Sequence, residues 1–296
     1  MSGAYSVGVR GRQWWFRPSA AGILALAAMV AFGLMPVSAS VTAGPFTNSG
    51  IDVSYPNCGA SQLSLTSTSP QFAIVGVTDG RPFTTYSCLS GTSGLWNAAV
   101  TATSTNQPSA YFNTGYSGAY GRDIVPLCAS NVGSAGASGN KHQKKQENQA
   151  WEIGCSEASY AYGVLTSMQQ VPTMLFADIE TSNSWSNNVT LNQYAIDGIS
   201  WGMANAGALG YSSETPTNND TGVYSSAKMW TKITGSGKWY PTPQVTANWV
   251  TQGTCPGSST SPSTSPSAFD PGPNSQTPTW LAQGAAIDGI DTDTVC

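Results

Sequence analysis

From residue 51 onward, short runs of apolar and β-branched residues alternate with glycine, proline and polar stretches. Several of these runs are almost continuously apolar, which is typical of strands that are covered on both faces. The pattern predicts eight strands, at residues 51–54, 72–77, 110–113, 173–178, 222–225, 245–250, 279–283 and 289–294.

Helical patterns fill several of the gaps between these runs. Apolar or small residues recur at helical spacing over 151–169 and 190–206, and Gly207 is placed to end the second helix. Shorter helices are expected over 93–102 and 227–233. Strands that alternate with helices favour an α/β fold, and eight strands in about 255 residues favour a closed TIM-type (β/α) barrel. Because the last three strands leave little room for helices, we expect the barrel to be irregular at its C-terminal end.

Two polar segments interrupt this pattern. Residues 115–148 are rich in glycine and serine and contain a basic run at 141–145, which we interpret as the solvated tip of a loop. Residues 256–278 form a Ser/Thr/Pro tract, expected to be a mobile loop because strand-like sequence resumes after it. We therefore predict one domain over residues 44–296, with inserts at 115–148 and 256–278.

Residues 1–43 are predicted to be a signal peptide. Three arginines precede an apolar stretch over 20–35, and small residues near 39–43 suit a signal peptidase. The apolar stretch is short for a permanent membrane span, and a retained N-terminal anchor is the alternative. We expect a secreted, extracellular protein that has no membrane contact after the signal is removed.

The amino-acid composition restricts the partners and the catalytic groups that this chain can use. Charged residues make up only 9% of the chain, and removal of the signal leaves eight Lys and Arg against fifteen Asp and Glu, a net charge of −7. This acidity argues against nucleic acid and anionic membrane as partners. The single histidine, His142, lies in the basic run beside no nucleophile motif, which argues against His-dependent catalytic triads and His-rich metal sites. We expect neither a cofactor nor a metal.

Acidic residues mark the ends of predicted strands. Asp178 and Glu180 follow the apolar run 174–177 and, two residues apart, project to the same side of an extended chain. Two carboxyl groups this close do not ionise independently, so one tends to keep a proton beside an anion, as glycoside hydrolysis requires. The alternative interpretation is that one of these two carboxyl groups caps the next helix and the other is solvated at the end of the strand. Asp52 in the first strand and Asp291 in the last would meet where a closed barrel joins these strands.

Six short motifs occur in order at 49–54, 72–77, 110–113, 178–180, 222–226 and 289–293. As an ordered set they resemble glycoside hydrolase family 25, the muramidases, whose irregular barrel has five βα units and three further strands. The cysteine layout and the segments 55–59 and 180–185 are similar to secreted actinobacterial proteins that carry a glycoside-hydrolase-like domain on this barrel.

The resemblance implies a role for each acid. Glu180 would be the general acid, and Asp178 would orient or stabilise the substrate's acetamido group or the cationic intermediate. Asp52 and Asp291 would be supporting carboxylates at the barrel floor. We expect the strand-end acids Asp178 and Glu180 to be solvated at the barrel mouth. The strand end at 111–113, Tyr-Phe-Asn, departs from the family's usual Tyr-His-Phe-like pattern, which changes a polar group in the sugar site.

Three aromatic residues at predicted strand ends, Tyr111, Tyr224 and Trp249, are candidate substrate-binding residues that stack on sugars; barrel-mouth packing is the alternative. The resulting hypothesis is a secreted, monomeric glycosidase that cleaves β-1,4 links in peptidoglycan or a related polysaccharide. A catalytically inactive glycan-binding or cell-wall protein on the same barrel is the main alternative, and a purely structural secreted domain is a third.

An even number of cysteines in an exported chain indicates three disulfides, for which fifteen pairings are possible. We predict pairing in sequence order: Cys58–Cys88, Cys128–Cys155 and Cys255–Cys296.

Overall fold

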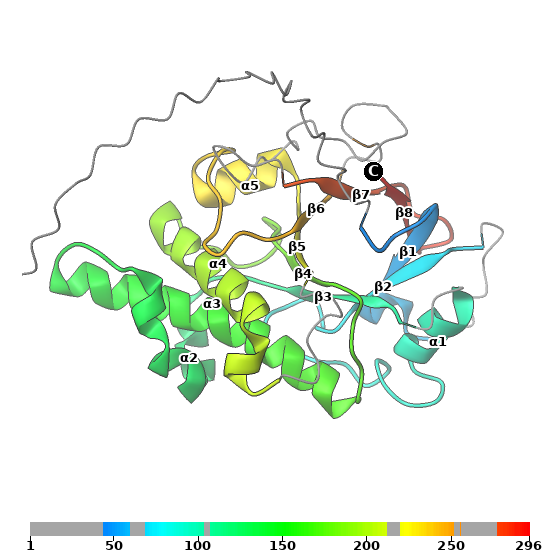
Figure 1. Cartoon of the computed structure of the whole chain (residues 1–296), viewed down its shortest axis with the longest axis horizontal. Coiled ribbons are helices and arrows are strands. Elements are labelled where there is room, and N and C mark those ends of the chain that lie inside the picture. The colour runs from blue at the N-terminus through cyan, green and yellow to red at the C-terminus, as the bar shows by residue number, and fades with distance from the viewer. Residues whose placement is uncertain (1–43, 60–68, 104–106, 212–219, 252–254, 256–276) are drawn as a thin grey trace, which may run out of the picture. The chain divides into compact units, whose positions relative to one another are not determined.

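The computed structural model describes residues 44–59, 69–103, 107–211, 220–251, 255 and 277–296. Within this part of the chain, eight strands close into a barrel in sequence order (Figure 1). The predicted irregular (β/α) barrel is thus confirmed. The strands are β1 (Ser49–Val53), β2 (Phe72–Gly76), β3 (Ser109–Asn113), β4 (Leu175–Asp178), β5 (Thr221–Ser225), β6 (Ala247–Val250), β7 (Thr279–Gln283) and β8 (Asp291–Val295).

The last strand runs against the others. Strands β1 to β7 are parallel to one another, whereas β8 is antiparallel to both β7 and β1. A parallel return needs a crossover of about a dozen residues or more, and the connection over 284–290 is shorter than that. The chain therefore turns back directly, and the start of β8, not its end, lies at the end of the barrel where β1 to β7 finish.

The helices follow the strands. They are α1 (Leu95–Ala102) after β2, α2 (Pro126–Ser130) and α3 (Lys141–Ser167) after β3, α4 (Val189–Ala204) after β4 and α5 (Ala227–Thr234) after β5. All four predicted helices are present. Helices α3 and α4 pack against each other on one side of the barrel (Figure 1).

The basic run at 141–145 lies in a helix, so its assignment to a loop tip was wrong. Asn140 starts α3 early, because its side-chain oxygen accepts the backbone N–H groups of His142 and Gln143, and Gln143 completes a capping box. The basic residues are exposed in the first turns of α3. The rest of the 115–148 insert is also structured, with α2 and short 3-10 helices.

Apolar packing forms two layers separated by the sheet. In β2, Ala73 and Val75 pack outward in a cluster that includes residues of α3 and α4, whereas Phe72 and Ile74 belong to a second cluster without helix residues. Since strand side chains alternate, this second cluster fills the barrel interior. We call three of its rings the plug: Phe72, Phe176 and Phe46, which contacts the other two.

Three disulfides join the six cysteines in sequence order, as predicted. Cys58 pairs with Cys88, Cys128 with Cys155 and Cys255 with Cys296, and none of the described cysteines is free. The first ties the segment after β1 to the loop after β2, and the third fixes the C-terminus. The predicted signal peptide at 1–43 and residues 256–276 of the Ser/Thr/Pro tract lie outside the described residues.

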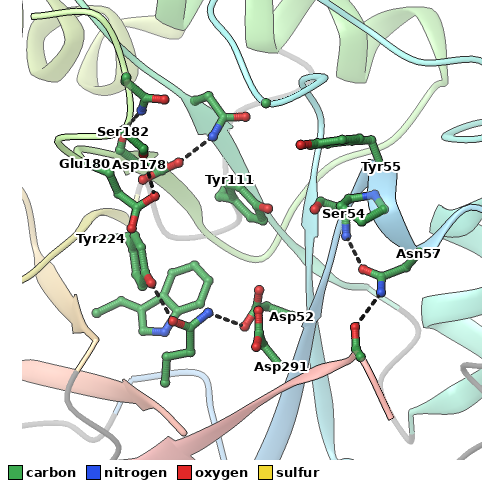
Figure 2. A pocket seen from close by; sticks show the side chains of 17 residues that line it. Asp52, Ser54, Tyr55, Asn57, Tyr111, Asp178, Glu180, Ser182, Tyr224 and Asp291 are labelled. Atoms are coloured by element: carbon green, nitrogen blue, oxygen red, sulfur yellow. Dashed lines mark hydrogen bonds between the residues drawn. The ribbon is translucent and has the colours of Figure 1, made fainter. Parts of the chain in front are cut away.

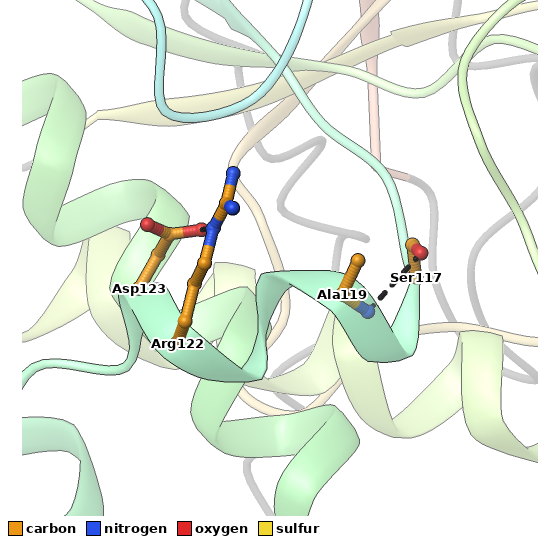
Figure 3. A network of polar contacts seen from close by, with 4 residues as sticks. All are labelled: Ser117, Ala119, Arg122 and Asp123. Carbon is orange, nitrogen blue, oxygen red and sulfur yellow. Dashed lines mark hydrogen bonds and ion pairs between the residues drawn. The ribbon is translucent and has the colours of Figure 1, made fainter.

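Charge contributes little to holding this fold together. One ion pair is found among the described residues, 3.5 Å between Arg122 Nε and Asp123 Oδ2 in the 3-10 helix Gly118–Asp123 (Figure 3). The Arg122 side chain is 83% exposed, and exposed pairs of this kind contribute about 0–1 kcal/mol. Within the described ranges, no helix has both the length and the apolarity needed to cross a bilayer.

Candidate active site

A pocket of about 550 Å³ opens where β1 to β7 end and β8 begins (Figure 2). Such an edge is where parallel barrels build their sites. The pocket is lined by all four predicted catalytic acids and all three predicted aromatic residues. Polar groups that the sequence analysis did not assign also line it, among them Tyr55, Asn113 and Gln283.

Strand register brings these side chains together. Asn113, Asp178, Tyr224 and Trp249 are successive partners across β3, β4, β5 and β6, so they form one row around the barrel wall. At the closure of the barrel, Asp52 of β1 pairs directly with the first residue of β8, Asp291. The predicted meeting of these two acids is therefore confirmed, and it depends on the antiparallel direction of β8.

Asp178 is deeply buried, with 3% of its surface exposed, so the expectation of a solvated strand-end acid was wrong for it. It lies at an inward position two residues beyond the plug residue Phe176, and the closed barrel wall surrounds it. Asn113 Nδ2 donates a hydrogen bond to its Oδ2. Its other oxygen, Oδ1, is buried and has no hydrogen-bond partner among the described residues.

Burial is the main reason that the pKa of Asp178 lies well above its usual value, and the nearby Glu180 carboxylate raises it further. The Asn113 hydrogen bond opposes this rise because it favours the charged form, and Asn183, whose Nδ2 donates to the backbone oxygen of Asp178 at 3.4 Å, also lowers the pKa. The result is a carboxyl group that readily holds a proton unless its amide donors keep it ionised.

Glu180 lies two residues beyond the end of β4 and is only partly buried. The Ser182 hydroxyl donates to its Oε2 at 3.2 Å, and Trp185 Nε1 donates to its backbone oxygen at 2.8 Å. The segment directly after Glu180 thus holds both its side chain and its backbone. Burial raises the pKa of Glu180, the Ser182 hydrogen bond lowers it, and the charge of Asp291 raises it. Figure 2 shows Asp178 and Glu180 side by side at one wall of the pocket.

Asp52, on the opposite wall, is 6% exposed. Gln283 Nε2 donates to Asp52 Oδ2 at 3.0 Å, and the Tyr224 hydroxyl donates to Gln283 Oε1. Burial, followed by the charge of Asp291, raises the pKa of Asp52 to about 7, although the Gln283 hydrogen bond lowers it. Asp291 is less buried, and burial raises its pKa as well.

Asp293 is a further acid of this cluster that was not among the predicted site residues. It is buried two residues along β8 from Asp291 and accepts a 2.8 Å hydrogen bond from Trp249 Nε1. Burial and the charge of Asp52 raise its pKa well above the usual value. The sequence signal that could have identified Asp293 as a site residue was its position two residues after Asp291.

The predicted aromatic residues line the pocket to different extents. Trp249 is 2% exposed and packs against Tyr224 at 4.5 Å and Tyr111 at 5.9 Å between ring centroids. These contacts favour the packing interpretation for Trp249. Tyr224 is also buried, with its hydroxyl used by Gln283, and Tyr111 is partly buried.

Tyr55 is the exposed ring that sequence reasoning missed. It begins the 3-10 helix Tyr55–Asn57 after β1 and is 44% exposed at the pocket rim (Figure 2). Its ring lies over Gly80, where an added Cβ would come within 2.9 Å of it. A tyrosine directly after a strand that carries a site acid was a usable signal for a sugar-stacking residue.

Among the described residues, no three His, Cys, Asp or Glu side chains are grouped so that they could hold a metal ion. The described residues that line the pocket include no lysine, arginine or histidine. What the arrangement offers chemically is carboxyl groups with raised pKa values, suited to donating and accepting protons.

No protein-family model matches the chain, and no curated protein matches its sequence. Solved structures do match. A bacterial lysozyme from Streptomyces coelicolor is 18% identical, with a TM-score of 0.46 over 85% of this chain and 93% of that one. A muramidase from Trichobolus zukalii is 13% identical, with a TM-score of 0.46 over 84% and 94%. A muramidase from Acremonium alcalophilum is 15% identical, with a TM-score of 0.43 over 84% and 94%.

Proposed function

We propose that this chain is a secreted, extracellular glycoside hydrolase that cleaves β-1,4 links in peptidoglycan or a related polysaccharide, in the manner of a muramidase. The observation that carries the proposal is the carboxyl pair at the end of β4. Asp178 and Glu180 line one pocket, the first almost fully buried and the second partly open, and Asp178 Oδ1 has no partner in the described part of the chain. The ordered motifs that resemble the muramidase family add to this support.

Glu180 is the proton donor in this mechanism. Its raised pKa keeps a proton available, and its partly open position lets it reach the glycosidic oxygen. As the bond between the anomeric carbon and that oxygen breaks, the proton moves from Glu180 to the leaving oxygen, and the sugar develops positive charge at the anomeric carbon. Glu180 then acts as a base and takes a proton from the attacking water.

Asp178 faces the charged sugar. Its unpartnered oxygen would accept the N–H of a 2-acetamido group and so orient that group, or its carboxylate would stabilise the cationic centre directly. Either role requires Asp178 to be ionised while Glu180 is protonated. Asp291 on the opposite wall supports this division, because its negative charge disfavours loss of the Glu180 proton.

Release of new reducing ends tests the proposal. The mature protein is incubated with purified bacterial cell walls and with other β-1,4-linked polymers between about pH 4 and pH 7, where carboxyl catalysis operates. The products are identified by mass. Fragments with new reducing ends at muramic acid or another amino sugar are the expected result. Binding of glycan without any cleavage across this range would instead indicate a glycan-binding protein.

A further inference from the structure

Three neighbouring strands carry a continuous chain of hydrogen bonds that ends on Asp178. Thr78 follows β2, Asn113 ends β3 and Asp178 ends β4, and the strand register places them at the same level of the barrel. The Thr78 hydroxyl donates to Asn113 Oδ1 at 2.9 Å, and Asn113 Nδ2 donates to Asp178 Oδ2. This is a hydroxyl–amide–carboxylate relay.

Thr78 determines which way the amide points. Its hydroxyl oxygen accepts the backbone N–H of Asn113 at 2.8 Å, so the hydroxyl hydrogen is free to be donated to the side-chain oxygen of the same residue. With Oδ1 engaged in this way, the amide presents its N–H₂ group to Asp178. Thr78 is 2% exposed and does not line the pocket, so it acts on the site only through Asn113.

A carboxylate gains from this arrangement and a protonated carboxyl group does not. An amide N–H₂ can only donate, and the hydrogen bond that it makes to an ionised oxygen is stronger than one to a neutral acid. The relay therefore also fixes the rotation of the Asp178 carboxyl group, leaving Oδ1 as the oxygen that has no partner within the described residues.

We propose that Asn113 is a positioning residue for Asp178, holding this carboxyl group ionised and oriented, and that Thr78 fixes the orientation in which Asn113 does so. The part of this inference that concerns turnover rests on the proposed function. The part that concerns Asp178 does not, because it is read on the free protein.

Removal of the amide leaves the opposing influences on Asp178 in place. Burial and the carboxyl groups of Glu180 and Asp52 favour its neutral form. The phenols of Tyr111 and Tyr224 also face it. In Asn113→Leu, which keeps the side-chain size but has no donor, the titration midpoint of Asp178 rises by about one to two pH units, the equivalent of one charge-assisted hydrogen bond.

Carbon-13 NMR titration of the Asp178 carboxyl carbon measures this shift. Thr78→Val is expected to raise the midpoint by a smaller amount, about half a unit, and Thr78→Ser, which keeps the hydroxyl, to leave it within about 0.3 units. Asn97→Leu, the same substitution in helix α1, is the matched control and leaves the midpoint unchanged. An unchanged midpoint in folded Asn113→Leu would overturn the inference.

If Asn113→Leu does not fold, the wild type decides. In the wild type, the nitrogen-15 NMR signal of the Asn113 side-chain N–H₂ group should change with pH, with the same midpoint as the Asp178 carboxyl group. An Asn113 signal that does not change over the Asp178 titration would overturn the inference. In turnover, the acidic limb of the pH–kcat/KM profile, which reports groups of the free enzyme, should move up in Asn113→Leu by the same amount as the midpoint. A wild type without turnover contradicts the proposed function alone, whereas turnover with an unmoved midpoint contradicts the positioning role alone.

Discussion

The two ends of the barrel interior are built from the same strands but from opposite kinds of side chain. One end is filled by the plug, and at the other the inward positions of β1, β3, β4 and β7 carry polar side chains, whereas β6 places Trp249 there. In β4, Asp178 lies two residues after the plug residue Phe176. In β1, Asp52 lies two residues after Gly50, where the absence of a side chain leaves room for the Phe72 ring. A step of two residues thus separates tight apolar packing from the site.

The two ends contribute oppositely to stability. The plug removes large apolar surface from water, which stabilises the folded chain. The mouth keeps several carboxyl groups buried and close together, and the raised pKa values of Asp52, Asp178 and Asp293 indicate that their charged forms are unfavourable there. The comparison indicates that the plug offsets a mouth that is arranged for chemistry and not for stability.

The largest effect on stability is expected at the plug. Phe176→Ala removes a fully buried ring that contacts Trp249 and Phe46, and such truncations cost about 3–5 kcal/mol. Urea unfolding should show a lower midpoint with a similar slope. Arg122→Ala, at the exposed ion pair, is the surface control and should cost less than about 1 kcal/mol. A loss below this control value in Phe176→Ala would refute the role given to the plug.

The next effect concerns pH and the mouth. The pKa of Asp52 is about 7 in the folded chain and near 3.8 without burial, so between these values the folded state binds more protons than the unfolded state. The stability associated with this group is present below about pH 4 and is lost as pH rises through about 7, by an amount on the order of a few kcal/mol. Urea midpoints measured across this interval should fall with pH in the wild type.

Asp52→Asn sharpens this test, because it should flatten the pH dependence and make the chain more stable at neutral pH. His142→Ala, at an exposed position in the first turn of α3, is the control and should leave the slope unchanged. Stability that increases from about pH 4 to pH 7 would contradict the account of the mouth as an unfavourable cluster.

The smallest expected effect is on the pH profile of turnover in the same His142→Ala variant. His142 lies outside the pocket lining, so the proton transfers belong to the mouth carboxyl groups and the profile should keep both limbs. A limb that disappears in this variant would mean that the catalytic assignment is wrong.

Much of this arrangement could be predicted from the sequence because it depends on local periodicity. The alternation along each strand placed Asp178 and Glu180 on one side, and the order of the strands brought Asp52 to Asp291. The cysteine order predicted the pairing that the structure contains.

What could not be predicted depends on contacts between distant segments. The roles of Asn113 and Gln283 follow from which strand lies beside which and at what register, and the burial of Asp178 follows from barrel closure. The start of α3 was missed because the glycine- and serine-rich composition of 115–148 outweighed the capping signal of Asn140 and Gln143.

Glu180→Gln tests the central claim most directly. The substitution keeps the side-chain shape and removes the proton, and loss of a general acid costs about 10²–10⁴-fold in rate. Glu152→Gln, the same change on α3 outside the pocket, is the matched control. We predict that Glu180→Gln still folds and binds glycan fragments as the wild type does, while its release of reducing ends falls by that factor and that of Glu152→Gln does not. Full activity in Glu180→Gln would contradict the account.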